Sequence, residues 1–160
     1  MLILNKDLWE TDQILKVHSS DDWESAESAL MLQCTLDEIK NMFENNTGRP
    51  AVLILDCNKG VLPPLSVFMK VFKLLLTLRK MLAQKLNFTI LYVKKEEDQQ
   101  TVNNILKLYK SVRPIMKARS NDDIRIFMKR RDIMEAEMKS FDEIDEVDSD
   151  EEEKCLEAMN

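Results

Sequence analysis

The sequence predicts an α/β fold with a central, mainly parallel sheet, followed by an acidic tail without a fold of its own. From residue 51 onward, short apolar runs alternate with segments of helical periodicity in the order strand, helix, strand, helix, strand, helix. That order is typical of parallel sheets joined by crossover helices. Residues 140–160 hold ten acidic side chains and one basic one, with too little apolar surface to offset the cost of ordering them.

A chain of 160 residues is long enough for one domain and a tail. We assign residues 1–139 to a single α/β domain, made of an N-terminal segment (1–48) and a core (49–139), and residues 140–160 to the tail. Charge is distributed unevenly: residues 1–49 carry −6, residues 50–139 carry +9 and the tail carries −9. The overall charge of −6 therefore conceals a basic middle.

The core begins with residues 51–57, a continuous apolar run that predicts an interior strand. Pro63 and Pro64 then open a long helix, because proline suits the first helical turn. Its polar residues form one stripe: Ser66, Lys70, Lys73, Thr77, Lys80 and Gln84. The next apolar run, 88–93, predicts a second strand. We expect four residues of these runs to be buried on neighbouring strands: Val52, Ile54, Leu91 and Val93.

The remainder of the core continues the alternation. Apolar residues at helical spacing predict a helix that ends before Pro114: Val102, Ile105, Leu106, Tyr109 and Val112. Residues 115–118 predict a third strand. Ser120 and Asp123 form a capping-box signature that starts the last helix, which is expected to reach Lys139. Its inner face consists of Ile124, Phe127 and Met128.

The N-terminal segment is less regular. Residues 14–17 predict an edge strand. Thr35 and Glu38 form a second capping-box signature, which predicts a helix start there and an inner face with Ile39 and Phe43. Asn45 to Gly48 end that helix. Residues 23–33 suit either a separate helix or a strand.

Cysteine usage and apolar stretches bear on the compartment. Cys34, Cys57 and Cys155 follow no disulfide framework, which indicates free thiols in a reducing environment. The first ten residues lack the basic region and cleavage site of a signal peptide. Residues 61–82 are the most apolar stretch, but four basic side chains within them exclude a membrane span. We expect a cytoplasmic protein without a transmembrane segment, and a nuclear location stays open.

Composition excludes several enzyme classes, and no cofactor or metal is predicted. Two glycines are too few for most phosphate-cradling loops, and the single histidine, His18, is interpreted as an ordinary surface residue. In open α/β sheets, ligands bind beyond the carboxyl ends of the strands. For the first core strand, those positions are Asp56, Cys57, Asn58 and Lys59. A cysteine phosphatase would need an arginine at position 63, where the chain has Pro63.

Residues 52–58, Val-Leu-Ile-Leu-Asp-Cys-Asn, resemble the strand and Asp-x-Asp start of haloacid-dehalogenase-like phosphatases. The resemblance implies that Asp56 is the nucleophile. Asn58 replaces the family's second aspartate, the general acid, and an amide cannot donate a proton as a carboxylic acid does. A phosphatase-like remnant centred on Asp56 is therefore kept as an alternative function.

A second resemblance covers residues 49–131. This part is similar to STAS domains (the anti-sigma-factor-antagonist type) and to the C-terminal part of CRAL-TRIO lipid-binding domains. The matching features are the run 52–56, the long apolar helix, the strand 88–93, the helix before Pro114 and residues 124–127. A STAS-like domain implies a protein-interaction role, and a CRAL-TRIO-like one implies an anionic-lipid binder. Residues 64–67, Pro-Leu-Ser-Val, lack the aspartate and glycine of the STAS phosphorylation turn, so no phospho-switch is implied.

Basic side chains cluster after the second core strand, and we interpret them as a face for a protein partner. They are Lys94, Lys95, Arg113, Lys117, Arg119, Arg125, Lys129, Arg130 and Arg131. Such a face also suits nucleic acid or anionic lipid. Aromatic residues make up 6% of the chain, and Tyr109 and Phe127 occupy core positions, which argues against base stacking. The acidic tail is expected to associate with this face or to compete for its ligands.

Ser140 and Ser149 stand in acidic contexts that suit acidophilic kinases, and they are the predicted phosphorylation sites. From these features the sequence predicts a non-enzymatic protein-interaction or scaffold subunit of a larger assembly. The phosphatase-like and lipid-binding alternatives remain beside it.

Overall fold

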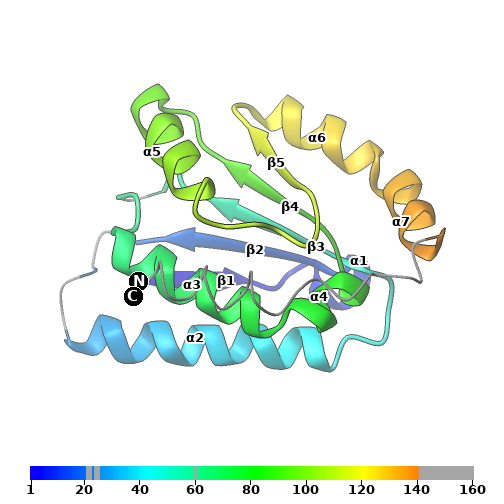
Figure 1. Ribbon diagram of the computed structural model, residues 1–160, viewed down its shortest axis with the longest axis horizontal. Helices are drawn as coiled ribbons and strands as arrows, with labels where there is room; N and C mark the ends of the chain where they lie inside the picture. The colour runs from blue at the N-terminus through cyan, green and yellow to red at the C-terminus, as the bar shows by residue number, and fades with distance from the viewer. Residues whose placement is uncertain (21–22, 24–25, 60, 141–160) are drawn as a thin grey trace.

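A computed structural model of the chain describes residues 1–20, 23, 26–59 and 61–140. Its centre is a five-stranded sheet whose strands follow one another in chain order (Figure 1). The strands are β1 (Leu2–Asn5), β2 (Ile14–Ser19), β3 (Ala51–Asp56), β4 (Leu86–Tyr92) and β5 (Ile115–Ala118). Strand β1 runs antiparallel to β2, and the other neighbouring pairs are parallel. The predicted α/β class and mainly parallel sheet are therefore confirmed.

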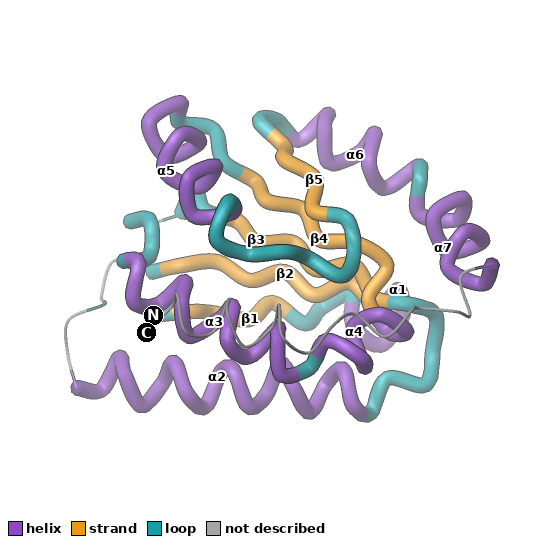
Figure 2. The backbone as a smooth tube through the Cα atoms, viewed as in Figure 1, coloured by secondary structure: helices purple, strands orange, loops and turns teal. Residues whose placement is uncertain are grey.

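Helices cover both faces of the sheet (Figure 2). In the described residues they are α1 (Trp9–Asp12), α2 (Ala26–Glu44), α3 (Leu65–Thr77), α4 (Arg79–Lys85), α5 (Glu96–Leu106), α6 (Asn121–Lys129) and α7 (Arg131–Ser140). Helices α2 to α5 pack on one face, and α6 and α7 pack on the other. None of the described helices is long and apolar enough to cross a membrane.

The two central strands, β3 and β4, carry the core. Side chains alternate along a strand, so Val52, Phe88 and Ile90 face α6 and α7, and Leu53 and Leu91 face the opposite helices. Both apolar runs are buried because helices cover each face of these strands. The predicted burial of Val52, Ile54, Leu91 and Val93 is confirmed, since none is more than 9% exposed.

The N-terminal segment differs from its prediction in two ways. Strand β2 pairs on both sides, and the edge strand is β1, a four-residue element that the sequence analysis missed. The capping box predicted at Thr35 is wrong, because Thr35 lies inside α2. Its hydroxyl donates to the carbonyl oxygen of Met31 at 2.9 Å, one turn earlier, as a threonine within a helix can do.

Two predicted helices are each divided. The long helix after Pro64 separates into α3 and α4 at Leu78, whose φ and ψ are −92° and 8°. The last helix separates into α6 and α7 at Arg130. The predicted capping box at its start is confirmed, since the Ser120 hydroxyl accepts from the Asp123 N–H while the Asp123 carboxylate accepts from the Ser120 N–H. The predictions for residues 141–160, including Ser149, lie outside the described residues.

Candidate functional site at the carboxyl edge of the sheet

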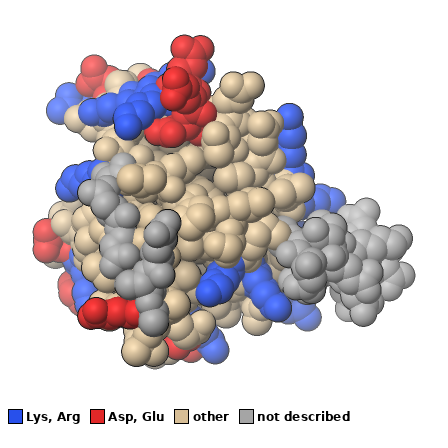
Figure 3. Space-filling view, turned by 90° about the vertical axis from the view of Figure 1, so that its left-hand side faces the viewer, with Lys and Arg blue, Asp and Glu red and all other residues tan. Residues whose placement is uncertain are grey.

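Four parallel strands end at one edge of the sheet, which is the usual ligand position in open α/β folds. Strand order places the ends of β2, β3, β4 and β5 side by side there. The polar segments that follow are Asp56 to Lys59 after β3, Lys94 and Lys95 after β4, and Arg119 and Ser120 after β5. Figure 3 looks onto this side of the molecule, where uncharged atoms occupy most of the centre and charged side chains gather toward the rim.

Asp56 is buried and fully engaged with its neighbours. Its side chain is 4% exposed, and Oδ2 lies 3.2 Å from the Lys16 ammonium. Oδ1 accepts hydrogen bonds from the backbone N–H and the side-chain amide of Asn58, both at 3.0 Å. Burial by itself raises the pKa of Asp56, but the hydrogen bonds from Asn58 and Lys16 outweigh it and hold the pKa below its usual value. This geometry fits a carboxylate with a structural role in the turn that follows β3.

Asn58 connects the ends of two strands. Its amide nitrogen donates to the Tyr92 carbonyl oxygen at 3.0 Å, and its amide oxygen accepts from the Lys94 N–H at 2.6 Å. An ionised aspartate at this position has no donor for Tyr92. The asparagine in place of the phosphatase aspartate therefore has a structural use in this chain.

Two other titratable groups, Cys57 and His18, lie at this edge of the sheet. Cys57 is buried, and burial, followed by the charges of Asp56 and Asp98, raises the pKa of its thiol to about 12. Little reactive thiolate exists at neutral pH with such a pKa. His18 is half-buried rather than an ordinary surface residue, and burial, followed by the charge of Lys59, lowers the pKa of its ring.

An apolar cavity of about 100 Å³ lies between the sheet and α3 and α5. Its lining includes Val17, Leu55, Phe68 and Ile105, and the rings of Phe72 and Tyr109 stack beside it with centroids 4.7 Å apart. Small-molecule sites typically measure roughly 300–1,000 Å³. The cavity is thus smaller than a lipid acyl chain would require in this conformation.

The connection between β3 and α3, together with the first residue of α3, carries exposed apolar side chains. Val61 and Leu65 are 57% and 54% exposed, whereas Leu62 packs against the buried cluster around Leu91. The buried Ser19 hydroxyl holds the start of the loop, with its oxygen 2.9 Å from the Lys59 carbonyl oxygen and 3.1 Å from that of Val61. We call residues 61–65 the apolar loop. It places apolar side chains at the edge where α/β folds bind their ligands.

The apolar loop was not predicted from the sequence, because Pro63 and Pro64 suit the start of a helix. Pro64 instead has φ −63° and ψ 156°, an extended conformation, and the helix begins at Leu65. The Pro63-Pro64 dipeptide was the signal from which an extended loop before the helix could have been predicted. A proline disfavours helical geometry in the residue before it, so paired prolines keep the preceding residues extended.

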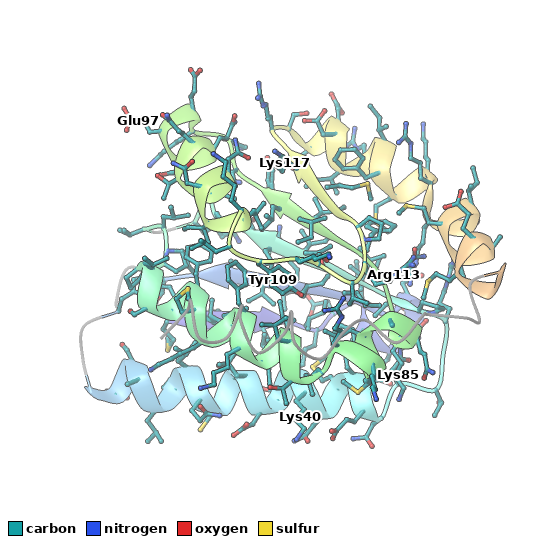
Figure 4. The ribbon with its side chains drawn as sticks, viewed as in Figure 1. Lys40, Lys85, Glu97, Tyr109, Arg113 and Lys117 are labelled. Atoms are coloured by element: carbon teal, nitrogen blue, oxygen red, sulfur yellow. The ribbon has the colours of Figure 1, made fainter. Side chains whose placement is uncertain are left out.

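The predicted basic residues are spread over several parts of the surface. Those at or near the carboxyl edge are Lys94, Lys95 and Arg119, and those on or just after α6 are Arg125, Lys129 and Arg130. Lys117 lies on β5, where its ammonium donates to the Asn103 amide oxygen of α5 at 2.8 Å. Figure 4 shows Lys117 beside α5 and Arg113 toward the other end of the sheet. The nine residues therefore do not form one face.

Two of the nine are structural. The Arg113 Nε donates to the carbonyl oxygens of Leu86 and Asn87, both at 3.1 Å. Arg131 is 5% exposed, and its Nη2 donates to the Pro50 carbonyl oxygen at 3.0 Å. Burial lowers the pKa of both guanidinium groups. Both guanidinium groups therefore stabilise the amino edge of the sheet, and their part in a partner-binding face stays a prediction. Ser140, the predicted phosphorylation site nearest to the domain, is the last residue of α7.

Replacing Asp56 with asparagine tests whether its charge serves the fold. The lowered pKa means that ionised Asp56 stabilises the folded state above the unfolded-state pKa of about 3.9 and loses this effect as pH falls through the folded-state value. We expect Asp56→Asn to fold with a lower free energy of unfolding near pH 6. The difference from the unmodified chain should shrink below about pH 4. Urea titrations across this range measure it.

Glu97→Gln is the matched control, because Glu97 is an exposed carboxylate that points away from the domain at α5 (Figure 4). Its free energy of unfolding should stay within about 0.5 kcal/mol of the unmodified chain at every pH. A pH-independent deficit in Asp56→Asn would show that the ion pair with Lys16 is not the source of the stabilisation.

Comparisons with known proteins return no match to a family model, to a curated protein or to a solved structure. Within the described residues, no three histidine, cysteine, aspartate or glutamate side chains lie close enough to hold a metal ion.

Proposed function

We propose that the chain is a non-enzymatic protein-interaction module, a subunit of a larger assembly, and that it binds its partner through the apolar loop. The observation that carries the proposal is the exposure of Val61 and Leu65 on a segment anchored at the carboxyl edge of the sheet. Contiguous exposed apolar patches are rare on monomeric proteins, and they often mark interaction sites. The anchoring by Ser19 reduces the ordering cost on binding.

The charges around the apolar loop favour a partner with acidic groups. Lys59 precedes the loop, and Lys94 and Lys95 follow β4 at the same edge of the sheet. Lys94 also lies over the Tyr92 ring, with Nζ 5.4 Å from its centroid. The partner is therefore expected to present apolar side chains to the loop and carboxylates to these lysines.

Two features support this function over the alternatives. The oxygens of Asp56 are engaged by Lys16 and Asn58, which disfavours a phosphatase nucleophile. The cavity of about 100 Å³ disfavours a lipid binder.

Cross-linking tests the proposal. Cells that produce the chain are treated with a lysine-reactive cross-linker. The chain is then isolated, and the linked peptides are identified by mass spectrometry. A stoichiometric protein partner should be linked through Lys59, Lys94 or Lys95. Links confined to Lys129 on α6 or to Lys6 near β1 would contradict the proposed surface.

A further inference from the structure

The outward side of α3 and α4 forms a basic ridge. Lys70, Lys73 and Lys80 lie on this side, and neither helix contains an acidic residue. All six members of the predicted polar stripe are exposed: Ser66, Lys70, Lys73, Thr77, Lys80 and Gln84. Within α3, the alternating spacing of four and three residues places Ser66, Lys70, Lys73 and Thr77 on one side of the helix. The sequence predicted this stripe, and the structure places it on the surface.

No ion pair between described residues uses Lys70, Lys73 or Lys80. Apolar side chains lie along the same part of α3, with Leu65 exposed and Met69 and Leu76 half-buried. We define the α3–α4 surface by Leu65, Met69, Lys70, Lys73, Leu76 and Lys80. It combines positive charge with apolar area, so a complementary ligand carries both acidic and apolar groups.

The chain itself contains a segment of that composition. Residues 141–153 hold nine acidic side chains and no basic one, and Phe141, Ile144 and Val147 recur among them at three-residue spacing. This segment follows directly on α7, which lies at the same end of the sheet as α4 (Figure 1). Thirteen extended residues span about 45 Å, whereas α3 and α4 together measure about 31 Å. The segment is therefore long enough to follow the whole surface.

We infer that residues 141–153 dock on the α3–α4 surface of the same chain. Carboxylates pair with Lys70, Lys73 and Lys80, and the apolar residues of the segment contact Leu65, Met69 and Leu76. Single exposed ion pairs are weak and are screened by salt, so docking depends on several pairs acting together. Covalent attachment supplies an effective concentration in the millimolar range, which favours this occupant over a separate acidic protein. The inference does not depend on the interaction function proposed above.

A spin label on the full chain tests the inference. Cys155 lies two residues beyond the segment, and replacing the exposed Cys34 by serine leaves the buried Cys57 as the other thiol. A nitroxide on Cys155 then broadens the amide NMR signals of nearby residues. We expect signal loss over α3 and α4 at roughly 20 mM salt, where the Debye length is about 20 Å. The signals should recover at roughly 500 mM, because the Debye length is then about 4 Å and the ion pairs are screened.

Charge variants identify the surface. Lys70→Gln/Lys73→Gln/Lys80→Gln should abolish the signal loss at low salt. Arg125→Gln/Lys129→Gln/Arg130→Gln removes the same charge from α6 and should leave it unchanged. Broadening centred on α6 and α7, or unchanged broadening in the α3–α4 variant, would overturn the inference. Broadening of an unlabelled ¹⁵N chain mixed with a spin-labelled ¹⁴N chain would also overturn it, because the occupant would then be the segment of a second copy.

Discussion

Replacing Ile90 with alanine should lower the free energy of unfolding by about 2–5 kcal/mol, the usual range for a large-to-small change in a packed core. Ile90 is 0% exposed at the centre of β4, and it packs in the cluster that α6 and α7 cover. The change removes apolar contacts and leaves a cavity that close-packed neighbours fill only in part. Urea denaturation at constant pH measures the loss.

Ile126→Ala is the matched control for this prediction. It removes the same atoms from an isoleucine that is 52% exposed on α6. Its free energy of unfolding should stay within about 0.5 kcal/mol of the unmodified chain. Equal losses at the two positions would contradict the placement of β4 between two helical layers.

The second large effect is expected on binding. Val61→Asp/Leu65→Asp introduces two charges into the apolar loop, where both side chains are more than half exposed. Because exposed positions tolerate aspartate, the midpoint of thermal unfolding should change little. Affinity for the partner should fall at least about tenfold, equivalent to about 1.4 kcal/mol, since a buried unpaired carboxylate is costly at an interface. Isothermal titration calorimetry with the purified partner measures this loss.

The control is Leu30→Asp/Met31→Asp on α2, which changes two adjacent apolar residues that are 67% and 42% exposed. This variant should bind the partner as the unmodified chain does. If it lost affinity while the loop variant kept it, the interaction surface would be on α2.

Elements with an unambiguous period or cap could be predicted from the sequence. The uniform runs of β3 and β4 predicted buried strands, and the reciprocal bonds of Ser120 and Asp123 followed from their spacing. Short or ambiguous elements could not be predicted. Strand β1 has only four residues, and Thr35 resembles a cap because a threonine hydroxyl serves equally well inside a helix.

Strand order was enough to predict that Asp56 lies at the carboxyl edge of the sheet. The sequence could not show that Lys16 and Asn58 engage its oxygens, because Lys16 comes from another strand. Charge counting likewise could not show that Arg113 and Arg131 contact backbone carbonyls at the opposite edge. Long-range contacts decide whether an arginine faces solvent, and composition does not record them.

The central claim is that the apolar loop is the binding surface. Hydrogen exchange, compared between the free chain and its complex with the isolated partner, tests this claim most directly. The N–H groups of Val61, Leu62 and Leu65 report on the loop, since Pro63 and Pro64 have none. The account predicts that partner binding slows exchange at these groups and leaves α6 and α7 unchanged. Protection confined to α6 and α7, with unaltered exchange at residues 61–65, would contradict it.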